Sequence, residues 1–97
     1  MKLDKLTKWD IQDHLNTPEE IKGYLDAAFE DGDPKLIVAA IGDVARAKGI
    51  SQIAEETGLT RAGLYKSLSK KGDPRLSTYI SILRSLNLKM TVETVAD

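Results

Sequence analysis

Basic side chains crowd one short stretch of the chain, between Thr60 and Arg75. This stretch holds five Lys or Arg residues against one acid, Asp73, which is a local net charge of +4. Ammonium and guanidinium groups neutralise phosphates, and an arginine can also bind guanine O6 and N7 through two hydrogen bonds. The stretch therefore favours nucleic-acid chemistry, although each base taken alone is compatible with a solvated helix face.

Two short helices joined by a tight turn are predicted over residues 50–69, and they are the elements that would position these bases. Ala54 is small enough for one helix to cross the other, and Gly58 tolerates the positive φ that the turn requires. The apolar side chains that would face the shared core are Ile53, Leu59, Leu64 and Leu68. Ser51 is expected to cap the first helix and Thr60 the second. An ordinary helical hairpin can show the same spacing, so the exposed residues have to decide between the two.

The exposed side chains of this unit favour double-stranded DNA. In a helix-turn-helix, the second helix enters the major groove with its first turn at the base edges. Arg61 is suited to guanine, Ala62 to a thymine methyl group, and Lys66 to a base or a phosphate. Gly63 either lets the backbone approach DNA closely or is tolerated because the helix is tethered at both ends. The predicted DNA-binding residues are Ser51, Gln52, Thr60, Arg61, Ala62, Tyr65, Lys66, Lys70 and Lys71.

Two longer helices are expected before this unit. Thr17 and Glu20 form a capping-box sequence that begins the first helix, and Gly32 ends it. Asp33 caps the second helix, which is expected to end at Gly49. The residues on their apolar faces are Ile21, Tyr24, Leu25, Ala28 and Phe29 in the first helix and Leu36, Ile37, Ala40, Ile41, Val44 and Ala45 in the second, with Val38 and Ala39 widening the second face.

A last helix is predicted over about residues 76–86, and an alternating tail follows it. The apolar residues of this helix are Leu76, Tyr79, Ile80, Leu83 and Leu86. In the tail, Leu88, Met90 and Val92 alternate with polar residues, which is the pattern of a short β-strand. Such a strand would pair with a second copy of the chain or add to a partner's sheet. The alternative is a frayed tail that packs a few side chains.

The net charge of −1 conceals an asymmetry between the two halves of the 97-residue chain. Residues 1–44 hold five Lys and ten acids, a net charge of −5. Residues 45–97 hold nine bases and five acids, a net charge of +4. An acidic half joined to a basic half suggests two different partners.

Other features argue against an enzyme, a metal protein or a membrane protein. The chain has no cysteine, which excludes disulfides and thiol catalysis and fits a reducing cytoplasm. His14 is the only histidine, and a lone histidine beside Asp13 is more often a surface residue than a base or a metal ligand. No glycine-rich phosphate loop occurs, so we expect no catalytic residue and no cofactor. The longest apolar run, Leu36–Ile41, is too short to span a membrane.

Several short motifs, taken in order and spacing, are similar to those of one known family. They are Trp9-Asp10 with Leu15, Glu20-Ile21, Tyr24-Leu25, Gly32-Asp33-Pro34, Ile41 to Arg46, Gln52 to Arg61, Leu64 to Leu68 and Gly72-Asp73-Pro74. From about residue 7 to residue 90, the chain resembles the HigA-like addiction module antidote proteins, which are antitoxins of the Cro/repressor (XRE-type) helix-turn-helix superfamily. Ser67 departs from the wider superfamily, in which an apolar core residue is common there. Leu68 is expected to take that role on a slightly rotated helix.

The resemblance implies an antitoxin. Such a protein neutralises a RelE/ParE-like toxin, a small basic protein that commonly cleaves ribosome-engaged mRNA. It also binds its own operator as a homodimer and represses the toxin–antitoxin operon, which implies a cytoplasmic protein that joins the nucleoid on its operator. The implied fold is all-α: a five-helix, phage-repressor-like helix-turn-helix domain over residues 17–97, with an N-terminal arm over residues 1–16 and a possible short C-terminal β-strand.

The acidic half is the hypothesised surface for a basic toxin, because opposite charges steer association. Trp9 is the hypothesised hot spot, on an arm that either packs back on the domain or docks on a partner. The predicted toxin-binding residues are Trp9, Asp10, Asp13, Glu19, Glu20, Asp26 and Glu30. The alternative function is a stand-alone XRE-type repressor that responds to a small ligand and has no toxin partner. A purely protein-binding adaptor is a third interpretation.

Overall fold

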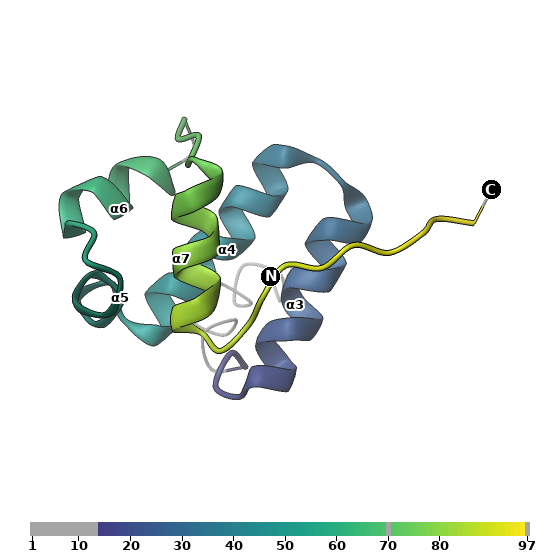
Figure 1. Cartoon of the computed structure of the whole chain (residues 1–97), viewed down its shortest axis with the longest axis horizontal. Helices are drawn as coiled ribbons and strands as arrows, with labels where there is room; N and C mark the ends of the chain where they lie inside the picture. Colours follow the sequence, from purple (N-terminus) through teal and green to yellow (C-terminus); the bar gives the residue numbers. More distant parts are fainter. Residues whose placement is uncertain (1–13, 70, 97) are drawn as a thin grey trace, which may run out of the picture.

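The computed structural model describes residues 14–69 and 71–96, and the regular structure of these residues is entirely α-helical. The five helices there are α3 (Pro18–Asp31), α4 (Pro34–Lys48), α5 (Ile50–Thr57), α6 (Arg61–Ser67) and α7 (Leu76–Ser85). In Figure 1, α3 lies at one end of the domain and the pair α5–α6 at the other, with α4 and α7 between them. The predicted all-α, five-helix class is confirmed. As a result, the acidic helix α3 and the helix α6, which carries Arg61 and Lys66, face different regions of solvent.

The capping box predicted at the start of α3 is present. The Thr17 Oγ1 atom accepts a hydrogen bond from the Glu20 backbone N–H at 3.1 Å. In return, the Glu20 Oε1 atom accepts from the backbone N–H of Thr17 at 3.1 Å and from that of Asn16 at 3.0 Å. These bonds, with the one from Asn16 largest, lower the pKa of the Glu20 carboxyl. The helix ends at Gly32, as predicted.

The helix predicted between the Asp33 cap and Gly49 is confirmed as α4. The Asp33 Oδ1 atom caps it by accepting from the Lys35 backbone N–H at 3.0 Å, and Gly49 ends it. Ile41, Val44 and Ala45 are fully buried where α4 meets the other helices. Leu15, which the sequence pattern places in the arm, is also buried in this core, so the packed domain begins before residue 17. Residues 1–13 of the arm lie outside the described residues.

Four large apolar residues that the helical periodicity assigns to buried faces are exposed instead. The exposed fractions are 43% for Phe29, 43% for Leu36, 61% for Leu76 and 39% for Ile80. In α7 the buried residues are Ile82 and Leu83, so this helix is rotated relative to the predicted face. A periodic stripe marks the residues that can face a core, but a small domain has too few neighbouring helices to cover a stripe of this width.

A polar cluster connects α3 to α4 beneath the surface. The Tyr24 hydroxyl donates to Asp43 Oδ2 at 2.6 Å, and Arg46 Nη2 donates to Asp43 Oδ1 at 3.0 Å. Asp43 is buried, and both of its carboxylate oxygens have a partner. Burial and the bond to Asp43 raise the pKa of the Tyr24 phenol. The cluster therefore ties the two helices together and pairs both oxygens of the buried Asp43 carboxylate.

The alternating tail is not a strand in the single chain. The segment 88–96 is irregular, and the sheet-like pattern of its residues is not matched by a ladder among the described residues. A β-strand needs a second strand to satisfy its backbone, and the helices of this domain offer none. The tail leaves the end of α7 and passes close to α3 (Figure 1). The carboxylate of Glu93 contributes there to the raised pKa of Lys22, after the larger effect of Asp26.

Candidate nucleic-acid interface

The first helix of the predicted pair, α5, is not capped as expected. The helix begins at Ile50, and its N-cap residue is Gly49. No side chain caps its backbone, and Ser51 is an exposed residue within its first turn. The prediction that Ser51 caps α5 is therefore wrong, because the glycine that ends α4 also starts α5.

The turn between α5 and α6 has the geometry that the sequence predicts. Gly58 has a φ of +80°, and its backbone N–H donates to the Ala54 carbonyl at 2.9 Å. The Thr57 hydroxyl donates to the Ile53 carbonyl at 2.7 Å and accepts from the Leu59 backbone N–H at 3.2 Å. Only glycine adopts this φ at no steric cost, so the sharp change of direction depends on Gly58.

The second helix, α6, has one buried side and one exposed side. Leu64 is 1% exposed, and Leu68, directly after the helix, is 5% exposed. The residues that face solvent are Arg61, Ala62, Tyr65 and Lys66. Thr60 caps the helix as predicted, because its Oγ1 atom accepts from the Gly63 backbone N–H at 3.0 Å. A Cβ atom on Gly63 would lie 2.8 Å from this oxygen, so the glycine also leaves room for the cap.

The loop after α6 packs directly against the end of that helix. A Cβ atom on Gly72 would lie 2.1 Å from the Ser67 carbonyl oxygen and 2.6 Å from that of Lys66. Both are backbone atoms, which cannot move without moving α6. Ser67 itself is half-buried, and its hydroxyl donates to the Leu64 carbonyl at 3.3 Å. The absence of a side chain at Gly72 therefore lets the loop pass closely over the end of α6.

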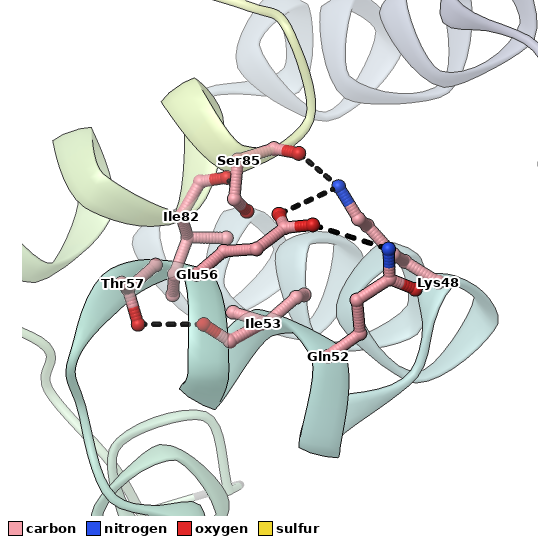
Figure 2. A network of polar contacts seen from close by, with 7 residues as sticks. All are labelled: Lys48, Gln52, Ile53, Glu56, Thr57, Ile82 and Ser85. Carbon is pink, nitrogen blue, oxygen red and sulfur yellow. Dashed lines mark hydrogen bonds and ion pairs between the residues drawn. The ribbon is translucent and has the colours of Figure 1, made fainter.

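A polar network holds α5 against α4 and α7 (Figure 2). Lys48 Nζ, at the end of α4, pairs with Glu56 Oε1 at 3.1 Å and also donates to the Ser85 carbonyl of α7. Gln52 Nε2 donates to the other oxygen of Glu56, Oε2, at 3.1 Å. The Lys48 bond, followed by that of Gln52, lowers the pKa of Glu56. Gln52, one of the predicted DNA-binding residues, is thus already held in place by its own helix.

The predicted DNA-binding residues divide into those that the structure describes and one that it does not. The described ones are Ser51, Gln52, Thr60, Arg61, Ala62, Tyr65, Lys66 and Lys71, and all are exposed. Lys70 lies outside the described residues. The exposed Arg75 follows at the N-cap of α7. The basic side chains therefore lie on α6 and on the loop that leads to α7.

The predicted toxin-binding residues on α3 are exposed as well. They are Glu19, Glu20, Asp26 and Glu30. Glu20 serves the capping box, and Asp26 pairs with Lys22 at 2.5 Å. Trp9, Asp10 and Asp13 lie outside the described residues. Sequence reasoning missed two exposed apolar neighbours of this acidic surface, Phe29 and Leu36, which flank the α3–α4 connection and were assigned to the core.

This arrangement defines a small all-α domain that presents a helix pair, of which the second helix, α6, carries basic side chains on its exposed side. The chain belongs to the family described as "Probable addiction module antidote protein", whose model matches residues 5–94. It is also similar to a protein of Haemophilus influenzae described as uncharacterized, with 40% identity over 90 residues, which are 93% of each chain. No solved structure matches the chain.

Membership of this family implies a protein partner, because an antidote counteracts a toxin. Within the part of the chain that the structure describes, no helix has the length and apolar character that crossing a membrane requires.

Proposed function

We propose that this antidote protein neutralises a RelE/ParE-like toxin and, as a homodimer, represses its own operon by binding operator DNA. In this proposal it is HigA-like and of the XRE type, with α5 and α6 as its helix-turn-helix, and it acts in the cytoplasm and on the nucleoid at its operator. The observation that carries the DNA part is the two-sided character of α6. Leu64 is buried on one side, and Arg61 and Lys66 face solvent on the other.

The proposed roles on DNA follow from side-chain chemistry. Arg61 reads guanine through two hydrogen bonds, and Ala62 contacts a thymine methyl group. Tyr65 and Lys66 lie one turn further along α6, where they contact a base or a phosphate. The residues that are proposed to contact the phosphates from the flanks of α6 are Ser51, Gln52, Thr60, Lys70 and Lys71.

The proposed toxin surface is formed by α3 and the start of α4. Its exposed acids suit a basic partner, and the opposite end of the domain is left free for DNA (Figure 1). Phe29 and Leu36 supply apolar anchors of the kind that carry binding energy at interface centres. The arm residues Trp9, Asp10 and Asp13 extend this proposed surface.

Fluorescence anisotropy with the promoter DNA upstream of this gene tests the DNA part. Arg61→Ala should weaken specific binding by about 1–3 kcal/mol and relax preference at one base pair. Arg84→Ala is the matched control, because Arg84 is an exposed arginine near the far end of α7. Equal losses on operator and on random DNA would reassign Arg61 to a phosphate, and no binding by the wild-type protein would contradict the proposal.

Co-purification with the product of the neighbouring gene tests the toxin part. A stable complex with a small basic protein, together with rescue of growth in cells that express it, is expected. Specific operator binding without any toxin complex would instead support the stand-alone repressor.

A further inference from the structure

The tail after α7 is held against the domain at Leu88 and is exposed from Lys89 to Ala96. The Leu88 backbone N–H donates to the Leu83 carbonyl at 2.8 Å, and Leu88 packs against the core. Among the described residues, no backbone hydrogen bond extends further along the tail than Leu88. Met90 is 47% exposed and Val92 is 96% exposed. The segment thus has an extended chain, strand-forming residues and a backbone that no residue of the described ranges 14–69 and 71–96 pairs.

We propose that residues 88–94 of two copies of this chain pair as an antiparallel two-stranded ribbon, with the two-fold axis at Thr91. This ribbon rests on the proposed function, because an operator with two-fold symmetry requires a homodimer. The exposed tail therefore pairs with the same tail of a second copy of this chain.

The charges of the tail select this register. With the axis at Thr91, Lys89 lies directly opposite the partner's Glu93, and Glu93 lies opposite the partner's Lys89. Opposite charges facing each other stabilise an antiparallel pair, and like charges destabilise it. Symmetry makes the ion pair occur twice in each dimer. Glu93 already lies near Lys22, so the ribbon would leave it between two cations.

The apolar residues agree with the same register. Met90 lies opposite the partner's Val92, and these two pairs fall on one face of the ribbon because side chains alternate along a strand. The ribbon therefore brings together side chains that the single chain leaves in water. A shift of one residue between the strands would place apolar residues opposite polar ones.

The other symmetric registers are less favourable. An axis at Lys89 places this lysine opposite the partner's Lys89, and an axis at Val92 places Lys89 opposite the partner's Val95. An axis at Met90 keeps the apolar face but leaves Lys89 opposite the partner's Thr91, without an ion pair. Only the axis at Thr91 satisfies both the charges and the apolar face.

Disulfide trapping in the full-length protein tests the register. The chain has no cysteine, so an introduced thiol reacts only with its copy in another chain. In Thr91→Cys the two thiols face each other across the axis, where directly opposite Cα atoms lie about 4.5–5.5 Å apart, within disulfide range. In the control Val95→Cys they are eight residues apart along the ribbon, or roughly 27 Å. We expect mild oxidation to convert only the first variant into a covalent dimer.

A charge swap tests the same interface without a covalent bond. Lys89→Glu and Glu93→Lys, each made alone, place like charges opposite each other and should weaken dimerisation roughly tenfold, measured by sedimentation. The double variant restores the pairs with reversed polarity and should return the dissociation constant towards the wild-type value. Both positions are exposed, so the fold should be retained in each variant, which circular dichroism checks.

The results that overturn the inference are distinct from those that overturn the proposed function. A wild-type protein that dimerises and binds operator, but whose Thr91→Cys variant gives no cross-link, contradicts the ribbon alone. Equal cross-linking of the two cysteine variants, or a double variant no better than the single ones, contradicts this register. A dimer that cross-links at Thr91→Cys but binds neither operator nor toxin supports the ribbon and contradicts the proposed function.

Discussion

The hydroxyl of Tyr24 donates a hydrogen bond of 2.6 Å to the buried carboxylate of Asp43. This contact joins α3, which carries the acidic surface, to α4, against which α5 packs. Arg46 supplies the second partner of Asp43, so the carboxylate is buried without losing its hydrogen bonds. The bond is thus a structural link between the two proposed binding ends of the domain.

Replacement of Tyr24 by phenylalanine should lower the free energy of unfolding by about 1–3 kcal/mol, because a buried carboxylate loses one of its partners. Urea denaturation followed by circular dichroism measures the change. Tyr65→Phe is the control, since Tyr65 is exposed on α6 and its hydroxyl has no such buried role. A loss of the same size in both variants would show that the Asp43 contact is not the cause.

Stability should fall at alkaline pH, and Tyr24 should account for part of the fall. Burial and the Asp43 bond raise the pKa of Tyr24 above its ordinary value of 10.0 in the folded protein. As the pH rises past about 10, the unfolded chain therefore loses this proton first, and the free energy of unfolding declines. The contribution is fully present below this pH. Between pH 8 and 11, the free energy of unfolding should decline less steeply in Tyr24→Phe than in the wild-type protein. Burial also raises the pKa of Tyr79, but this residue is retained in both proteins and does not affect the comparison. Equal slopes would contradict the assignment to Tyr24.

Two glycine-to-alanine substitutions should have opposite signs. Gly72→Ala drives a Cβ atom into the backbone of Ser67, so we expect lower stability and weaker operator binding. Gly23→Ala meets no atom within 4 Å on the exposed side of α3 and should stabilise the protein by about 0.5–1 kcal/mol. Thermal denaturation and anisotropy with the promoter DNA measure both effects. Unchanged operator binding by Gly72→Ala would show that α6 does not depend on this close approach.

Phe29→Ala should weaken the toxin complex by at least about 1 kcal/mol if Phe29 is an interface anchor. Leu76→Ala is the matched control, because Leu76 is also a large exposed apolar residue but lies at the start of α7. Isothermal titration with the purified toxin gives both affinities, and operator binding should be unaffected by Phe29→Ala. Equal affinities for the toxin would remove Phe29 from the proposed surface.

The elements of this fold were largely predictable from local sequence signals. Thr17 with Glu20, Asp33 and Thr60 mark helix starts through side-chain hydrogen bonds within three residues. Gly58 marks the turn through its own φ. Such signals depend only on near neighbours in the chain, so they can be read before the fold is known. The exception, Ser51, failed because Gly49 already served as the boundary of both helices.

The chain by itself therefore specified its helices, its acidic and basic halves and the likeness of its motifs to an antidote family. Tertiary packing decided which apolar stripe residues are covered, and it left Phe29, Leu36 and Leu76 in solvent. It also brought Tyr24 to Asp43, nineteen positions apart, and Lys48 to Ser85, thirty-seven apart. Periodicity marks the side of a helix that can be buried, but only the neighbouring helices determine how much of that side they cover.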